Sequence, residues 1–151
     1  MKNMEIERKF IPKYLPEEIK DATCHEIEQA YLNTFPVIRI RKSDDDYYLT
    51  YKGGGKMVHE EYNLPLNKEA YYHLLEKADG NIITKKRFEI PLNDGLIAEL
   101  DIFEGKFEGL LLVEVEFESE DAANSFIAPE WFGEDVTSDG RYHNSNLSKV
   151  K

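Results

Sequence analysis

The chain has 151 residues and a formal net charge of −11, with 32% charged and 41% hydrophobic residues. This length predicts a single domain over residues 1–151 with a core of its own. The composition excludes a disordered chain and a membrane-spanning helix, and the acidic balance argues against a protein that neutralises nucleic-acid phosphates over a broad surface.

The first predicted element is a strand over residues 4–10, and its residues alternate strictly. Glu5, Glu7 and Lys9 share one parity, and an apolar pair shares the other. A strand sends alternate side chains to opposite faces. Two carboxylates and one ammonium group are therefore expected on the same face of this strand.

Further strands and helices follow in turn along the chain. Strands are predicted at residues 26–35, 37–42, 47–52, 57–64, 82–92, 96–104 and 111–118. Helices are predicted at residues 16–20, 67–79, 119–128 and 144–149. Asn67 and Ser119 are the expected caps of the second and third helices, and Gly80 and Pro129 are their expected ends. Gly53-Gly54-Gly55 is predicted to be a mobile hairpin loop, because no Gly-Lys-Ser/Thr follows it as in a phosphate-binding loop.

Charged residues recur with matching parity in most of these strands, while the opposite faces are largely apolar. The charged positions are Glu5, Glu7, Lys9, Arg39, Arg41, Lys52, Glu61, Lys85, Arg87, Glu99, Asp101, Glu114 and Glu116. Consecutive antiparallel strands of this number can close into a barrel. We therefore predict an α+β fold: an eight-stranded antiparallel closed β-barrel whose charged faces line the lumen. The helices at 67–79 and 119–128 are expected to cover the apolar outer faces.

The residue types on the shared face indicate the chemistry of this lumen. Arginine forks match phosphate oxygens, and lysine contributes a point charge. Paired carboxylates on neighbouring strands favour a hard divalent cation such as Mg²⁺, which is commonly shared with substrate phosphates. The alternative is a solvated outer face, which predicts acids and bases mixed within each strand. The first, seventh and eighth strands are instead mostly acidic and the third is basic, which favours a metal–triphosphate site.

Other residues leave alternatives open or carry no site. Tyr31 shares the lumen parity, where it either packs or serves as a hydrogen-bond donor or base. His59 either faces the lumen and binds phosphate or lies at the surface. Cys24 and His25 are adjacent, but no partner nearby supports a zinc site or a nucleophilic cysteine.

The ordered set of charges resembles the CYTH superfamily, the triphosphate tunnel metalloenzymes. Glu5-Ile6-Glu7-Arg8-Lys9 is similar to the family signature Glu-x-Glu-x-Lys. The remaining matches follow in order: Arg39-x-Arg41, Lys52, Glu61, Lys85-x-Arg87, Glu99-x-Asp101 and Glu114-x-Glu116. The segment Pro129–Gly133 and the run from Val136 to Tyr142 resemble the tail of the short bacterial members.

This resemblance implies a tunnel that binds a triphosphate together with Mg²⁺ or Mn²⁺. The triphosphate would be held by Lys9, Arg39, Arg41, Lys52, Lys85 and Arg87. The first ion would be held by Glu5, Glu7, Glu114 and Glu116, with Glu61, Glu99 and Asp101 assisting a second. Tyr31 and Lys85 are the expected catalytic residues, assisting proton movement or the leaving phosphate.

The expected reaction is metal-dependent hydrolysis of inorganic tripolyphosphate to pyrophosphate and phosphate. The alternatives are a class IV-type adenylate cyclase, a thiamine or nucleoside triphosphatase, and a polyphosphate-binding module without turnover. The expected partner is a small-molecule triphosphate, with no nucleic acid and no membrane, and a homodimer stays open. We expect no export leader, and the single cysteine suits a reducing cytoplasm.

Overall fold

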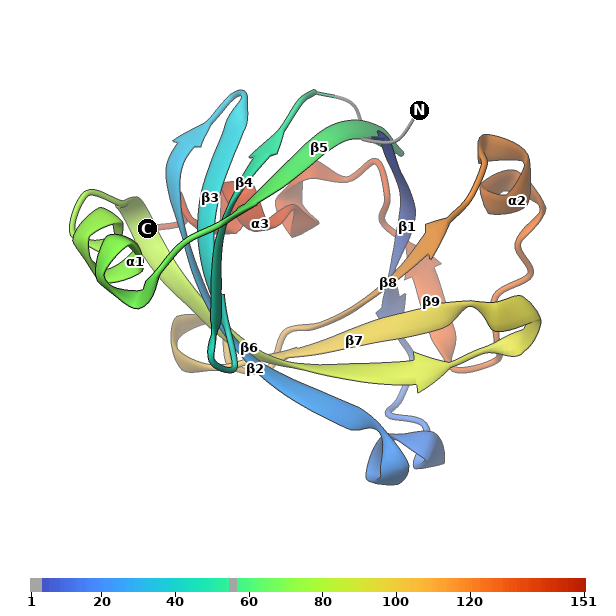
Figure 1. The fold of residues 1–151 in the computed structure, drawn as a ribbon. Coiled ribbons are helices and arrows are strands. Elements are labelled where there is room, and N and C mark those ends of the chain that lie inside the picture. Colours follow the sequence, from blue (N-terminus) through green and yellow to red (C-terminus); the bar gives the residue numbers. More distant parts are fainter. Residues whose placement is uncertain (1–3, 55–56) are drawn as a thin grey trace.

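The chain forms a closed antiparallel β-barrel (Figure 1). The computed structural model describes residues 4–54 and 57–151. The strands within those ranges are β1 (Met4–Pro12), β2 (Thr23–Thr34), β3 (Val37–Ser43), β4 (Asp46–Lys52), β5 (Val58–Pro65), β6 (Asp79–Pro91), β7 (Ile97–Phe103), β8 (Leu111–Phe117) and β9 (Phe132–Asp135). They are ordered β5-β4-β3-β2-β6-β7-β8-β1-β9, and an additional β5–β1 pairing closes the barrel. The predicted eight-stranded barrel is confirmed.

The β1 strand holds the barrel together because both of its edges are used. One edge pairs with β8 from Ile6 to Phe10. The other edge pairs first with β5, where Glu5 lies opposite His59, and then with β9, where Pro12 lies opposite Phe132. The prediction of eight strands missed β9, because a strand of four residues between turn residues is too short to show a clear alternation.

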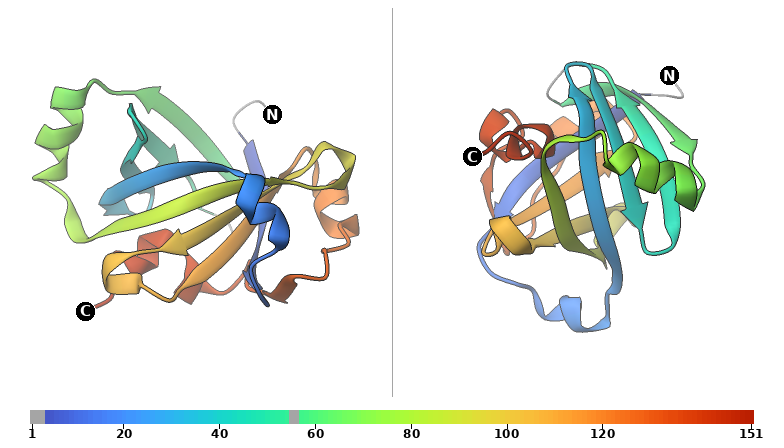
Figure 2. Two further views of the ribbon diagram at one scale, coloured as in Figure 1. Left: turned by 90° about the horizontal axis from the view of Figure 1, so that it is seen from below. Right: turned by 90° about the vertical axis from the view of Figure 1, so that its left-hand side faces the viewer.

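Three α-helices lie outside or against the barrel (Figure 2). They are α1 (Lys68–Leu75), α2 (Glu120–Ser125) and α3 (Asn144–Leu147), and short 3₁₀ turns occur at Glu17–Asp21, Asn93–Gly95, Gly105–Phe107 and Gly140–Tyr142. The caps were predicted correctly: the Asn67 side chain accepts from the amide of Ala70 at 2.7 Å, and the Ser119 hydroxyl accepts from Ala122 at 3.0 Å. None of the helices in the described ranges is long and apolar enough to cross a membrane.

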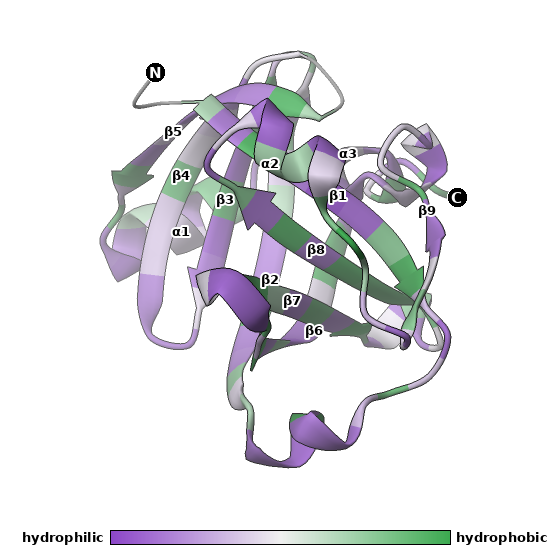
Figure 3. Cartoon of the chain, turned by 90° about the vertical axis from the view of Figure 1, so that its right-hand side faces the viewer, coloured by the Kyte–Doolittle hydropathy of each residue, from purple (hydrophilic) through white to green (hydrophobic). Residues whose placement is uncertain are grey.

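The outer faces of the strands are apolar and are covered as the sequence predicts. Figure 3 shows the alternation of hydrophilic and hydrophobic bands along strands such as β8. Tyr71 of α1 packs on Ala30 and Ile40. The α2 residue Ala123 packs with Phe10 in a larger cluster that also contains β6, β7, β8 and tail residues. Burial of these faces leaves the opposite, charged faces pointing into the barrel.

One end of the lumen is apolar, a feature that the prediction of a charge-lined lumen did not include. Ile83, Phe103 and Leu112 share strand parity with the charged residues Lys85, Asp101 and Glu114. They form a buried cluster with Tyr31 and with two residues of the tail, Val136 and Leu147. The tail therefore packs against the apolar end of the barrel, and the charged positions occupy the remainder.

The α1 helix is shorter than predicted, and Gly80 has a different role from the one predicted. The helix ends at Leu75, although Ala78 still packs with its cluster, and β6 already begins at Asp79. Gly80 has a φ of +74°, and a Cβ at this position would lie 2.1 Å from the carbonyl oxygen of Ser148. A glycine here therefore lets the C-terminal segment lie directly on β6, where it accepts a hydrogen bond from the Asn81 amide at 2.6 Å.

We expect Gly80→Ala to destabilise the protein by about 2–3 kcal/mol, because it combines an unfavourable backbone conformation with a clash against the tail. The matched control is Gly95→Ala, since Gly95 has the same φ of +74° but nothing within 4 Å of a Cβ. The control should lose only about 1 kcal/mol. Denaturant unfolding measures both variants. Equal losses would show that the close approach of Ser148 contributes nothing.

Candidate functional site

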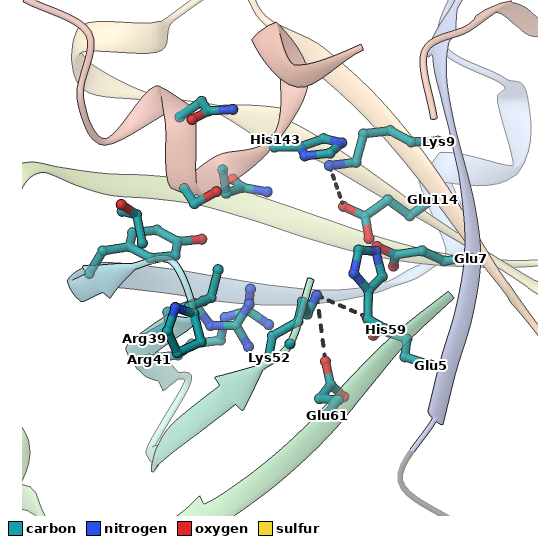
Figure 4. A pocket seen from close by; sticks show the side chains of 18 of the residues that line it. Glu5, Glu7, Lys9, Arg39, Arg41, Lys52, His59, Glu61, Glu114 and His143 are labelled. Atoms are coloured by element: carbon teal, nitrogen blue, oxygen red, sulfur yellow. Dashed lines mark ion pairs between the residues drawn. The ribbon is translucent and has the colours of Figure 1, made fainter. Parts of the chain in front are cut away.

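The barrel encloses a cavity of about 700 Å³ (Figure 4). Most of the site residues predicted from the sequence line it: Glu5, Glu7, Lys9, Tyr31, Arg39, Arg41, Lys52, Glu61, Arg87, Glu99, Glu114 and Glu116. Lys85 and Asp101 do not line the cavity and are fully buried behind its wall. Matching strand parity therefore brought nearly the whole predicted set into one space.

The β3 strand contributes a wall of two arginines. Arg39 and Arg41 are each 7% exposed, and neither has a carboxylate within 4.0 Å in the described part of the chain. Burial lowers the pKa of Arg41, and the positive charges of Arg39 and Arg87 lower it further. Buried cations without a counterion are costly. An anion bound against this wall would therefore be stabilised by the two guanidinium groups.

The β1 and β8 strands contribute a wall of carboxylates on the other side of the cavity. Glu7 lies opposite Glu116 in the β1–β8 register, and Glu114 lies opposite Lys9. Burial raises the pKa of Glu7 well above its usual range, and the neighbouring Glu114 raises it further. Burial, together with Glu5, raises the pKa of Glu116 to about 7. Glu7 and Glu116 therefore hold negative charge poorly without a further cation beside them. Glu114 differs, because despite its burial Lys9 and Arg87 hold its pKa well below the usual range.

Carboxylate oxygens are the donors that Mg²⁺ and Mn²⁺ favour, so the acidic wall fits such an ion chemically. Across residues 4–54 and 57–151, however, no three His, Cys, Asp or Glu side chains are arranged so that they could hold a metal ion. An ion at this wall would therefore require the carboxylates to draw together or would take part of its coordination from substrate oxygens.

Two lysines form ion pairs with carboxylates of the cavity. Lys52 Nζ lies 2.9 Å from Glu5 Oε1 and 3.6 Å from Glu61 Oε2. Although burial lowers the pKa of Lys52, Glu7 and Glu5 together raise it above its usual range. Lys9 Nζ lies 3.5 Å from Glu114 Oε1. Figure 4 shows Lys52 between the arginines and the carboxylates. Lys52 therefore lies between the two walls, whereas Lys9 pairs with the carboxylate wall from β1.

Asp101 lies behind the wall and is bound by two bases. Its Oδ2 accepts from Lys85 Nζ at 2.7 Å, and its Oδ1 accepts from Arg87 Nε at 2.7 Å. Both carboxylate oxygens of Asp101 are thus bound by bases. The sequence-based expectation was that Asp101 would assist a second metal ion. Burial lowers the pKa of Lys85 to about 7 despite the opposing effect of Asp101. Lys85 can therefore exchange a proton near neutral pH. Arg87 NH1 also lies 3.4 Å from Glu99 on the cavity wall.

The C-terminal segment supplies lining residues that the sequence did not predict. These are Thr137, His143, Asn144, Ser145, Asn146 and Lys149. Asn144 Oδ1 accepts from Lys85 Nζ at 3.4 Å, and the carbonyl of Tyr142 accepts from Lys9 Nζ at 3.1 Å. The sequence predicted a helix at residues 144–149, and α3 spans Asn144–Leu147. Its sequence pattern did not indicate that these polar side chains would line the cavity.

The structure shows the positions of His59 and Tyr31, for which the sequence left alternatives open. His59 is 7% exposed and lines the cavity, so it faces the lumen rather than the outer surface. Tyr31 lines the cavity and also packs with Ile83 and Phe103. Tyr31 therefore lies at the boundary between the apolar end of the lumen and the charged cavity.

Comparison with known proteins identifies the family. A model of the CYTH domain matches residues 3–151. The chain belongs to the CYTH family. An inorganic triphosphatase of Nitrosomonas europaea is 40% identical to this CYTH chain over 150 residues, covering 95% of this chain and 96% of the relative. An inorganic triphosphatase of Acetivibrio thermocellus is 38% identical over 117 residues, covering 74% and 71%. The crystal structure of an inorganic triphosphatase has a TM-score of 0.72 and 37% identity, covering 97% of this chain and 95% of the other.

Within this CYTH chain, the arrangement can hold an anion and a cation at the same time. In the described ranges, the two arginines of β3 have no carboxylate within 4.0 Å, and in the carboxylate wall the pKa values of Glu7 and Glu116 are raised. The phosphates of a linear anion could bind the arginines, and a divalent ion bound to that anion could be held by the carboxylates. The geometry thus favours a metal-complexed polyphosphate over either ion alone.

Proposed function

We propose that this CYTH chain hydrolyses inorganic tripolyphosphate to pyrophosphate and phosphate with the help of Mg²⁺ or Mn²⁺. The observation that carries the proposal is that one cavity holds two buried arginines, which have no carboxylate within 4.0 Å in the described part of the chain, together with Glu7 and Glu116, whose pKa values are raised. Two relatives with 38–40% identity that are inorganic triphosphatases support the choice of substrate. The free, exposed thiol of Cys24 supports a reducing, cytoplasmic setting.

In this proposal, the bases bind the phosphates and stabilise the charge that develops during cleavage. Arg39 and Arg41 supply charge that no carboxylate within 4.0 Å offsets in the described ranges, while Lys9, Lys52 and Arg87 complete the set that lines the cavity. Lys85 would support this set from behind, through Asp101. Lys9 and Lys52 would exchange their carboxylate partners for phosphate oxygens. Preorganised donors aimed at developing charge are commonly the largest contribution to catalysis of this kind.

The carboxylates would hold the divalent ion. Glu5, Glu7, Glu114 and Glu116 would bind a first ion, and Glu61 and Glu99 would assist a second, with Asp101 acting through Arg87. A bound Mg²⁺ or Mn²⁺ would offset phosphate charge and orient the attacking water. Glu7 and Glu116 would give up protons as the ion binds, since burial favours their neutral forms.

We assign proton movement to Tyr31 and Lys85. The support for Lys85 is its pKa of about 7, which lets it donate or accept a proton at neutral pH. The support for Tyr31 is its place on the cavity wall. Because Lys85 lies behind that wall, it would act through its contacts with Asp101 and Asn144 rather than on the substrate directly.

The test is phosphate release from tripolyphosphate, ATP, GTP and thiamine triphosphate by the purified chain, with Mg²⁺, with Mn²⁺ and with EDTA. The proposal predicts that tripolyphosphate is the best substrate, that release needs the metal, and that ATP yields no cyclic AMP. Cyclic AMP from ATP would instead identify a cyclase. Tight binding of tripolyphosphate without release under any condition would identify a binding module.

Metal affinity should fall as pH is lowered through 7. The ion binds ionised carboxylates, whereas Glu116 holds a proton below about pH 7 and Glu7 has a raised pKa as well. Each proton displaced weakens binding about tenfold per pH unit below the pKa. Calorimetric titration of Mn²⁺ at pH 6 and pH 8, in two buffers of different ionisation enthalpy, measures both affinity and proton release. Equal affinities without proton release would contradict this expectation, and Glu116→Gln should flatten the dependence.

A further inference from the structure

The lumen bases differ in the kind of group that holds them. Lys9, Lys52, Lys85 and Arg87 each lie within 4.0 Å of a carboxylate: their partners include Glu114, Glu5, Asp101 and Asp101 respectively. The two arginines of β3 are held by neutral acceptors. Arg39 NH2 donates to the hydroxyl of Thr50 at 3.0 Å, and Arg41 Nε donates to the side-chain oxygen of Gln29 at 2.7 Å.

Among the described residues, the side chain of Gln29 forms a hydrogen bond with Arg41 alone. It lies on β2 directly opposite Arg41 on β3, and it is 0% exposed. A guanidinium group only donates hydrogen bonds, so the amide oxygen must face Arg41. This bond uses Nε and leaves the two terminal nitrogens of Arg41, which lines the cavity, for other partners. One of them lies 3.5 Å from the hydroxyl of Tyr48.

Holding the arginine in this way has a cost. The side-chain nitrogen of Gln29 is buried and has no hydrogen-bond partner among the described residues. A buried unsatisfied amide donor destabilises a fold, whereas an apolar side chain of the same size would not. A carboxylate at this position would form a stronger bond with Arg41, but it would also neutralise the guanidinium group.

We infer that Gln29 is a positioning residue that orients Arg41 toward the cavity while leaving its charge uncompensated, so that a phosphate oxygen of the substrate becomes its counterion. This inference rests on the proposed binding of a triphosphate in the lumen. It extends that function by naming the residue that keeps the arginine available. The neutral Thr50 performs the corresponding task for Arg39.

The test compares Gln29→Glu with Gln29→Met. The glutamate keeps the shape and the acceptor but adds a competing charge, while methionine keeps the approximate shape and removes the acceptor. Tripolyphosphate binding is measured by calorimetry in EDTA, KM and kcat are measured with Mg²⁺, and thermal unfolding is followed for each protein. Thr23→Glu, which adds the same charge at an exposed position of β2, is the control.

We expect Gln29→Glu to unfold at or above the temperature of the parent, yet to bind tripolyphosphate about 10- to 100-fold more weakly, the equivalent of one charge-assisted hydrogen bond. KM should rise by a similar factor, with kcat much less affected. Gln29→Met should also weaken binding, and Thr23→Glu should match the parent. Parent-like binding by Gln29→Glu would overturn the inference, and so would losses of binding that only follow losses of stability. Because the binding measurement contains no metal, it tests Gln29 even if the parent binds tripolyphosphate without hydrolysing it, which would contradict only the proposed function.

Discussion

Replacing Arg41 with alanine should lower kcat/KM for tripolyphosphate by about 100- to 1000-fold, the range found when one preorganised donor is removed from a charged reaction centre. Arg41 is buried on the cavity wall and has no carboxylate partner in the described ranges, so its full charge is available to the substrate. Steady-state phosphate release measures the effect. Arg41→Lys should recover only part of the activity, because lysine lacks the fork that bonds Gln29 and phosphate together.

The matched control for this prediction is Lys42→Ala. Lys42 is the next residue of β3, so its side chain points to the outer face, and its replacement removes the same unit of charge. Its activity should stay within about twofold of the parent, since a charge on the outer face of the barrel is screened by solvent. If Arg41→Ala and Lys42→Ala lost activity equally, the overall charge rather than the lumen geometry would be responsible.

Replacing Asp101 with asparagine should lower the free energy of unfolding by about 3–5 kcal/mol, the usual result of breaking a buried ion pair from one side. Asp101 is 0% exposed and binds both Lys85 and Arg87. Lys85 can relieve part of the penalty by releasing its proton, because its pKa is already lowered to about 7. Arg87 cannot do so, since a guanidinium group stays protonated in proteins. Denaturant unfolding at pH 7 measures the loss.

Asp139→Asn provides the comparison for the buried pair. Asp139 lies 2.7 Å from Arg141, whose side chain is 78% exposed. Exposed ion pairs contribute about 0–1 kcal/mol, so this variant should change little. A loss from Asp101→Asn that is no larger than that from Asp139→Asn would mean that the Lys85–Asp101–Arg87 group does not stabilise the barrel.

Strand alternation explains why so much of the cavity lining could be predicted from the sequence. The side-chain period of a strand is two, so placing Glu7 inside the barrel places Glu5 and Lys9 there as well. The same reasoning holds for Arg39 with Arg41 and for Glu114 with Glu116. Because the opposite faces needed burial against helices, the register had only one acceptable parity.

Parity has limits that Asp101 and Lys85 illustrate. It assigns a side chain to a face but does not say how deep the side chain lies. Asp101 shares the strand parity of Glu99, and Glu99 lines the cavity. The carboxylate of Asp101 instead lies deeper, where Lys85 and Arg87 bind its two oxygens. The apolar end of the lumen was missed for a similar reason, because Ile83 and Phe103 continue the charged parity and are covered only by the tail.

The tail could not be placed from the sequence because its position depends on tertiary contacts. Leu147 packs with lumen residues, and Ser148 lies against Gly80, about seventy residues away in the chain. Asn81 and Lys106 add hydrogen bonds to the carbonyl of Val150 at 2.6 Å each. None of these contacts has a local sequence signal, so the lining residues from Thr137 to Lys149 emerged only from the structure.

The most direct test of the central claim is a crystal structure of the chain grown with Mn²⁺ and tripolyphosphate, with manganese located by its anomalous scattering. The account predicts the anion inside the barrel with phosphate oxygens on Arg39 and Arg41, and manganese between that anion and carboxylates of the Glu5, Glu7, Glu114 and Glu116 set. Manganese and phosphate bound on the outer surface, or an anion in the lumen that contacts neither arginine, would contradict it.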